Sequence, residues 1–167
     1  GPLTADVLCY QQGGQLIGVD PATGQDVWRR FVSGGISEIF GDDEFVIVRP
    51  QGAGQLHVLR ALDGAIVATR EYPADALNPP SSHAWGRFRA TLASVDDDHD
   101  RLAMYDPATG REAWEMTLAS PVQWTTLDGD RLLVVDGRHE CRLLETATGK
   151  EVLRTLLPLE AADDASF

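Results

Sequence analysis

The acidic run VDDDHDR at residues 95–101 is the stretch of this chain whose side chains could most readily bind a metal ion. It contains four aspartates: Asp96, Asp97, Asp98 and Asp100. Carboxylate oxygens are the ligands that Ca²⁺ prefers, but the run lacks the central glycine and the distal glutamate of an EF-hand loop. In an alignment of the chain with itself, the run falls where other segments have hairpin turns. We therefore expect an exposed acidic turn here and no metal site.

The segment EYPADALNPPSSHAWGR at residues 71–87 is the longest irregular stretch, and its consecutive prolines cannot join the interior of a sheet. Insertions of this kind commonly carry function. His83, Trp85 and Arg87 lie near the start of an expected inner strand, where they could line the mouth of a channel. They are the candidate partner-binding residues, and the alternative is a surface loop in which Trp85 caps the core.

Nucleophilic catalysis finds no support in the spacing of histidines and cysteines. The four histidines are scattered along the chain: His57, His83, His99 and His139. No Cys-x-x-Cys or His-Glu-x-x-His spacing occurs, so a zinc site is not expected. Cys9 and Cys141 lie in apolar strand positions and are interpreted as buried thiols. The sequence thus predicts no catalytic residue, no metal and no cofactor.

Composition and charge narrow the class of partner. The chain has 167 residues, of which 43% are hydrophobic and 24% charged, as in globular domains. A net charge of −12 disfavours nucleic acid and anionic membranes and suits a basic protein partner. No apolar stretch approaches the roughly 20 residues that cross a bilayer, so direct membrane insertion is not expected. Residues 1–2 resemble a scar left by tag cleavage, so the start of the chain does not indicate a compartment.

The elements that must position these residues come from an internal repeat. DPATGQDVW at residues 20–28 returns as DPATGREAW at residues 106–114. Four glycines anchor four copies: Gly24, Gly64, Gly110 and Gly149. Their spacings of 40, 46 and 39 residues are typical of repeat architectures built from one small sheet per copy.

Each copy predicts a hairpin around its glycine, with alternating β-formers on both sides of a four-residue turn. Glycine accepts the positive φ that such a turn needs, and Asp20 or Asp106 can accept hydrogen bonds from turn N–H groups. Upstream strands are expected at residues 7–12, 44–50, 88–95 and 131–137, and inner strands at residues 36–40, 81–85 and 122–127. One unit is therefore four antiparallel strands in about 40 residues, which is the pattern of a propeller blade.

We predict an all-β fold, a β-propeller of four four-stranded antiparallel blades that forms a half-propeller or a fragment of a larger ring. The expected divisions are residues 1–2 (scar), 3–35 (blade 1, lacking its inner strand), 36–75 (blade 2), 76–119 (blade 3, with the inserted loop 71–87), 120–158 (blade 4) and 159–167 (a tail or closing strand). A homodimer could complete an eight-blade ring. A closed four-blade ring is the alternative.

The pattern small-x-Asp-x-x-Thr-Gly-x-x-x-Trp at Gly18–Trp28 resembles the tryptophan-docking motif of PQQ-like (quinoprotein-type) β-propeller repeats. The copy at Met104–Trp114 matches except at the small position. In that family the tryptophan packs against the motif of the neighbouring blade. The resemblance therefore implies that Trp28 and Trp114 form such joints, and that Ala68 and Leu153, which stand at the same repeat position, form weaker ones.

The resemblance implies a function only in outline, because the family includes both dehydrogenases and non-enzymatic scaffolds. We expect a non-enzymatic scaffold for protein–protein recognition. The first alternative is a small-ligand sensor domain of a bacterial signalling receptor, and a remote one is part of a PQQ-dependent dehydrogenase. The adjacent cysteines typical of such dehydrogenases are absent from this sequence. A bacterial periplasmic or extracytoplasmic setting is implied by the resemblance alone.

Overall fold

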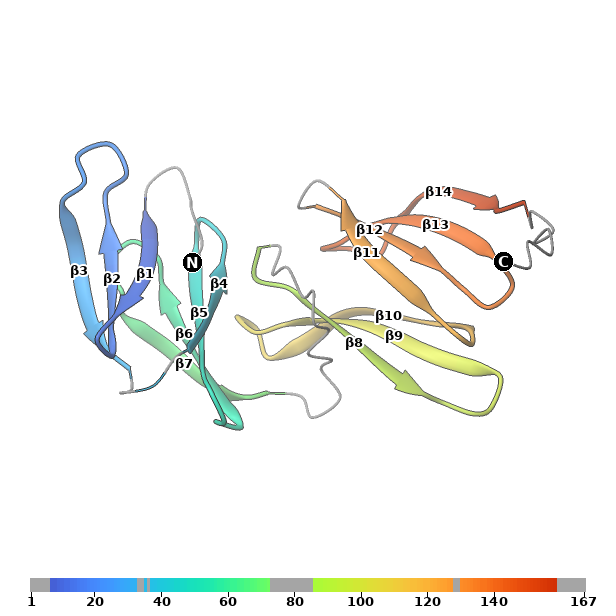
Figure 1. Ribbon diagram of the computed structural model, residues 1–167, viewed down its shortest axis with the longest axis horizontal. Coiled ribbons are helices and arrows are strands. Elements are labelled where there is room, and N and C mark those ends of the chain that lie inside the picture. Colours follow the sequence, from blue (N-terminus) through green and yellow to red (C-terminus); the bar gives the residue numbers. More distant parts are fainter. Residues whose placement is uncertain (1–6, 33–34, 36, 73–85, 128–129, 159–167) are drawn as a thin grey trace, which may run out of the picture.

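The structure is a computed structural model in which residues 7–32, 35, 37–72, 86–127 and 130–158 are described. Within these ranges the chain forms fourteen strands, and none of the described residues is helical. The strands make four antiparallel sheets that follow one another along the chain (Figure 1). The expected all-β arrangement of four antiparallel blades is confirmed. The described residues contain no apolar helix long enough to span a bilayer.

The blades keep the order of the chain. Blade 1 contains β1 (Leu8–Gln12), β2 (Gln15–Val19) and β3 (Asp26–Phe31), and blade 2 contains β4 (Ser37–Gly41), β5 (Phe45–Pro50), β6 (Gln55–Arg60) and β7 (Ile66–Glu71). Blade 3 contains β8 (Arg89–Ser94), β9 (His99–Asp106) and β10 (Arg111–Ala119), and blade 4 contains β11 (Gln123–Leu127), β12 (Arg131–Val135), β13 (Glu140–Glu145) and β14 (Glu151–Leu156). The inner strand expected at residues 81–85 lies outside the described residues.

The repeat glycines form the turn between the two outer strands of each blade. Gly24 has φ of 70°, and its N–H donates to the carbonyl oxygen of Asp20 at 2.8 Å. The Oδ1 atom of Asp20 also accepts from the N–H of Ala22 at 2.7 Å, which fixes the turn from inside. Asp106 repeats this bond to the N–H of Ala108 at 2.9 Å. A left-handed φ here is the physical reason why the glycine recurs in every copy.

The hydrophobic core is divided into three layers, one between each pair of successive blades. The layer between blades 1 and 2 contains Val7, Cys9, Leu16, Trp28, Val46, Val48, Leu59 and Ala61. The layer between blades 2 and 3 contains Phe40, Ile47, Leu56, Val58 and Tyr105. The layer between blades 3 and 4 contains Ala90, Leu102, Met104, Leu118, Val122, Leu132, Val134 and Leu144. Each blade is thus covered by its neighbours, as stacked sheets require.

Trp28 lies across the joint between blades 1 and 2. Its Nε1–H donates to the carbonyl oxygen of Ala61 at 2.8 Å, and its ring covers Gly64 so closely that a Cβ there would lie 2.5 Å from the ring. A Cβ on Gly18, which lies in the same blade as Trp28, would be only 2.3 Å from the ring. Two glycines on different blades therefore make room for one tryptophan, which explains the small residue that opens the motif.

Trp114 makes the equivalent contact between blades 3 and 4. Its Nε1–H donates to the carbonyl oxygen of Thr146 at 2.7 Å, and a Cβ at Gly149 would lie 2.7 Å from the ring. The two ends of the row of blades have no such contact. Among the described residues, no atom outside the immediate chain neighbours lies within 4 Å of a Cβ built on Gly24, and Leu153 is 55% exposed. Blades 1 and 4 lie at opposite ends (Figure 1), so the described residues form an open part of a ring and not a closed four-blade ring.

Candidate functional site

The joint between blades 2 and 3 combines its apolar layer with several charged side chains. Blade 2 carries Ala68 at the tryptophan position, and Arg70, two residues further along β7, occupies the corresponding space. A Cβ at Gly110 would lie 3.0 Å from the Nε atom of Arg70, and a terminal nitrogen of Arg70 donates to the carbonyl oxygen of Ala108 at 3.3 Å. The guanidinium thus takes the place of an indole. Our expectation from Ala68 alone did not include this contact.

Arg30 is the equivalent residue of blade 1, because it also lies six positions after the repeat glycine. Its Nε–H donates to the carbonyl oxygen of Gly64 at 2.9 Å, beside the docked Trp28. Arginine at this position therefore reaches the next blade in both copies that carry it. This recurrence in the sequence is the signal by which Arg70 could have been found.

Arg87 lies in the turn that precedes β8, and three carboxylates surround its guanidinium. The distances are 3.3 Å to Asp42, 3.2 Å to Glu44 and 3.2 Å to Asp106. Asp42 and Glu44 belong to the β4–β5 turn of blade 2, whereas Asp106 ends β9 of blade 3. Arg87 therefore ties two blades together, and its charge is neutralised within the protein.

The other two candidate partner-binding residues, His83 and Trp85, lie outside the described residues. Nothing in the structure therefore brings them together with Arg87 or separates them from it.

A second ionic cluster lies deeper in the same joint. The Oε1 atom of Glu38 accepts from Arg89 at 2.7 Å, and its Oε2 atom accepts from Arg49 at 3.0 Å. The guanidinium of Arg89 lies 3.3 Å from the ring centroid of Phe40, and that of Arg49 lies 4.4 Å from the centroid of Tyr72. Burial lowers the pKa of Arg89 and raises that of Tyr72, while Glu38 opposes the shift at Arg89. Glu38 is thus shared by two arginines from different blades.

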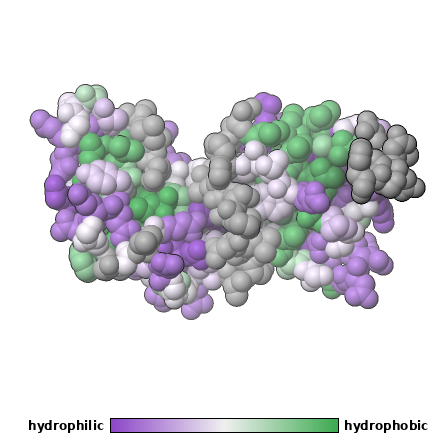
Figure 2. Space-filling model, viewed as in Figure 1, coloured by the Kyte–Doolittle hydropathy of each residue, from purple (hydrophilic) through white to green (hydrophobic). Residues whose placement is uncertain are grey.

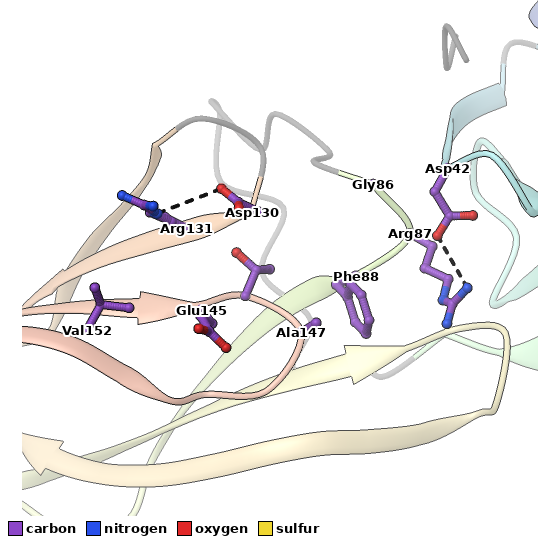
Figure 3. Close-up of a pocket in the computed structure, with 10 residues that line it drawn as sticks. Asp42, Gly86, Arg87, Phe88, Asp130, Arg131, Glu145, Ala147 and Val152 are labelled. Atoms are coloured by element: carbon purple, nitrogen blue, oxygen red, sulfur yellow. Dashed lines mark hydrogen bonds and ion pairs between the residues drawn. The ribbon is translucent and has the colours of Figure 1, made fainter. Parts of the chain in front are cut away.

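A cavity of about 440 Å³ opens beside Arg87 (Figure 3). Its lining comes from the ends of blades 2, 3 and 4: Asp42, Gly86, Arg87, Phe88, Asp130, Arg131, Glu145, Thr146, Ala147 and Val152. We call these ten residues the cavity rim. Phe88 and Val152 supply apolar wall. Asp130 and Glu145 supply carboxylates, and Arg131 lies 4.0 Å from Asp130.

The acidic run at 96–98 forms the exposed turn between β8 and β9. The N–H of Asp98 and the ring of His99 both contact the Oδ1 atom of Asp96 at 2.9 Å, and these bonds, the backbone one first, lower the pKa of Asp96. Asp100 is buried in β9 and is separated from that turn. Among the described residues, no three His, Cys, Asp or Glu side chains converge as metal ligands.

Stacked antiparallel blades, with three or four described strands each and docked through one residue per repeat, define a β-propeller built from repeats. The sequence matches the family model described as outer membrane protein assembly factor BamB over residues 12–84 and 98–164. The chain belongs to this family of PQQ-like repeat propellers. A comparison with curated protein sequences found no match.

Solved structures that this chain matches include three bacterial and fungal proteins. BamB from Moraxella catarrhalis is 21% identical with a TM-score of 0.39, and the match covers 92% of this chain and 50% of that one. AztD from Citrobacter koseri is 12% identical with a TM-score of 0.50, covering 92% and 45%. The Cps50 (Swd1) β-propeller domain from Myceliophteria thermophila is 16% identical with a TM-score of 0.45, covering 92% and 52%. The chain thus spans about half the length of these structures.

Proposed function

We propose that this chain is a non-enzymatic β-propeller scaffold that binds a protein partner at the cavity rim. The observation that carries the proposal is the cavity itself, which combines apolar wall from Phe88 and Val152 with carboxylates from Asp130 and Glu145. Such a cavity suits a segment that carries an apolar side chain next to a basic one. The matched family is described as an assembly factor, which also favours a scaffold.

Charge favours a basic partner over an acidic one. Arg87 lies in the cavity wall, but three carboxylates neutralise it. Arg131 lies 4.0 Å from Asp130 and Lys150 lies 3.8 Å from Glu145, so the preference for a basic partner rests mainly on the charge of the whole chain. The whole chain carries a net charge of −12, which attracts cations over the range of the Debye length. Complementary charge of this kind mainly raises the association rate and selects among partners.

Two synthetic peptides test the proposal, one alternating arginine with leucine and one alternating glutamate with leucine. We expect isothermal titration to detect binding of the arginine peptide only. Asp130→Asn and Glu145→Gln should each weaken it about two- to fivefold, as expected for partly exposed charges. Asp97→Asn, in the exposed β8–β9 turn, is the matched control and should change nothing. Equal losses in the control, or equal binding of both peptides, would contradict a site at the cavity rim.

The cavity volume supports a second candidate function, recognition of a small ligand as in a sensor domain. About 440 Å³ lies within the range of roughly 300–1,000 Å³ that is typical of small-molecule sites. A compound that raises the melting temperature of the protein, but not that of Val152→Asp, would favour this function. Competition between such a compound and the arginine peptide would show that both use the cavity.

The absence of catalysis is part of the proposal and has its own test. Titrating the protein into PQQ with Ca²⁺ should leave the absorbance spectrum of PQQ unchanged. A saturable spectral shift would contradict the non-enzymatic assignment and would revive the dehydrogenase alternative.

A further inference from the structure

The cavity rim carries two carboxylates at a place where the two preceding blades carry charges of opposite sign. These carboxylates belong to Asp130 and Glu145 of blade 4, and both residues line the cavity. We infer that the group bound between them is the guanidinium of an arginine side chain in a segment of the partner protein. The inference rests on the proposed function, because it names the group that enters the partner-binding cavity. Figure 2 shows the surface of the whole molecule, on which hydrophilic and hydrophobic residues alternate.

Strand pairing shows which turn residues of the three blades are equivalent. One residue of β5, β8 and β12 pairs with the residue five positions before the repeat glycine: Val46, Arg89 and Leu132. The residue two positions before each of these lies in the preceding turn: Glu44, Arg87 and Asp130. The same backbone hydrogen bond supports the alignment of blades 2 and 4. The N–H group of Ala61 donates to the carbonyl oxygen of Glu44 at 3.0 Å, and that of Thr146 donates to the carbonyl oxygen of Asp130 at 2.8 Å.

The charge at this turn position can be compared with the charge four positions before the repeat glycine of the same blade. In blade 3 the two residues are Arg87 and Asp106, and they form an ion pair at 3.2 Å. In blade 2 the signs are exchanged, with Glu44 in the turn and Arg60 in the hairpin. In blade 4 both positions hold the carboxylates of the cavity. Blade 4 therefore lacks, at this place, the cation that blades 2 and 3 carry.

Two cations of blade 4 lie near these carboxylates but form no hydrogen bond with them. Arg131 lies 4.0 Å from Asp130, and Lys150 lies 3.8 Å from Glu145. All four side chains are at least 42% exposed, so water screens both pairs. Arg87 is held by three other carboxylates. An arginine from outside can thus bind the two carboxylates without breaking a hydrogen-bonded ion pair.

The walls of the cavity favour a guanidinium over an ammonium group. Asp130 and Glu145 lie on the blade 4 side of the cavity, and Phe88 lies on the blade 3 side (Figure 3). A planar guanidinium donates N–H groups in several directions and stacks on aromatic rings, whereas an ammonium is a compact point charge. Phe88 already makes this kind of contact, because the guanidinium of Arg87 lies 5.4 Å from its ring centroid. One guanidinium can therefore contact both walls.

Thr146 gives an independent indication that a polar group enters the cavity. The residue lines the cavity and is 5% exposed. Its N–H group donates to Asp130, and its carbonyl oxygen accepts from Nε1 of Trp114 at 2.7 Å. The hydroxyl oxygen is buried and has no hydrogen-bond partner among the described residues. Because buried hydroxyl groups are rarely left unpaired, we expect rotation about χ1 to turn this one toward a bound N–H donor.

Isothermal titration with three peptides tests the inference, each peptide alternating leucine with arginine, lysine or citrulline. The arginine peptide should bind about tenfold more tightly than the lysine peptide, as expected for one additional hydrogen bond to a charged group. Citrulline keeps the planar shape without the charge, so its peptide should bind no better than the lysine peptide. Argininamide alone should bind about tenfold more weakly than the arginine peptide, because it lacks the leucine contacts.

The outcomes separate this inference from the proposed function. Equal affinity of the arginine and lysine peptides would overturn the guanidinium and leave a basic partner standing. Binding of neither peptide would contradict both. Equal affinity of argininamide and the arginine peptide would assign the cavity to a small ligand and overturn a protein segment as its occupant.

A charge reversal inside the protein supplies the second test. Asp130→Arg places in blade 4 the residue that blade 3 has at the same position, so the new guanidinium should pair with Glu145 and occupy the place of the ligand. The side chain of Asp130 is 79% exposed, so the variant should fold, with a melting temperature no lower than that of wild type. Its affinity for the arginine peptide should fall at least about tenfold.

Two further variants make the test specific. Asp97→Arg, in the exposed β8–β9 turn, changes the net charge by the same amount and should weaken binding less than about twofold. Thr146→Val removes only the hydroxyl group and should weaken the arginine peptide about threefold, while leaving the lysine peptide unchanged. Equal losses in Asp130→Arg and Asp97→Arg, or an arginine preference that Thr146→Val does not alter, would overturn the inference.

Discussion

Replacing Trp28 with alanine should remove most of the stability of the joint between blades 1 and 2. The side chain is 7% exposed, and truncating a buried tryptophan costs about 3–5 kcal/mol. The carbonyl of Ala61, which is itself buried, also loses its donor, and this adds about 1 kcal/mol. The sum is a large fraction of the roughly 5–15 kcal/mol that stabilises a domain.

Urea unfolding followed by far-ultraviolet circular dichroism measures this loss without relying on the deleted fluorophore. Trp28→Phe keeps an aromatic ring but not the N–H group, so it should cost about 1–2 kcal/mol and separate packing from the hydrogen bond. Leu153→Ala is the matched control, since it changes the same repeat position on an exposed strand. Because the Leu153 side chain is 55% exposed, this variant should stay within about 0.5 kcal/mol of wild type. A loss below about 1 kcal/mol for Trp28→Ala, or one no larger than that of the control, would refute the docking explanation.

Two further changes test the polar joint and a buried thiol. Arg70→Ala should lower the free energy of unfolding by about 1–2 kcal/mol, because the bond to Ala108 and the cover over Gly110 are both lost, and Arg70→Met should recover the packing part in the same urea assay. Burial raises the pKa of the Cys9 thiol to about 11 from an ordinary 9.0, so the stability that this group contributes is complete below pH 9 and is lost as pH rises to 11. Between pH 8 and pH 10.5 the free energy of unfolding from urea titrations should therefore fall further for wild type than for Cys9→Ala, by up to about 2 kcal/mol, and parallel changes would contradict this.

The fold could be predicted from the sequence because its main constraint is local. Each blade needs a left-handed residue between its outer strands, so glycine recurs at a fixed place and the copies can be aligned. The tryptophan joints were predicted from the family resemblance. The structure explains one of them physically, because Gly18 and Gly64 lack the Cβ atoms that would collide with the ring of Trp28.

The site could not be predicted in the same way. Arg87 was a candidate because of the unusual segment around it, but its contacts with Asp42 and Asp106 depend on how two blades are placed relative to each other. Arg70 shares its repeat position with Arg30, which is a sequence signal, but its contact with Ala108 also depends on how blade 3 is placed against blade 2. The cavity arises from turns of three blades that are far apart in sequence, and no spacing rule brings them together.

The chemistry of the three joints differs, and this difference bears on the function. Blades 1 and 2, and blades 3 and 4, are joined by a docked tryptophan and an apolar layer of eight buried residues. Among the described residues, blades 2 and 3 share five such residues, and Arg70, Arg87 and Arg89 add polar contacts across the joint.

The cavity adjoins this joint and takes its lining from blades on both sides of it, with Asp42 from blade 2 and Glu145 from blade 4. On the proposed function, a segment bound in the cavity therefore contacts both pairs of blades and stabilises the arrangement in which they are held together.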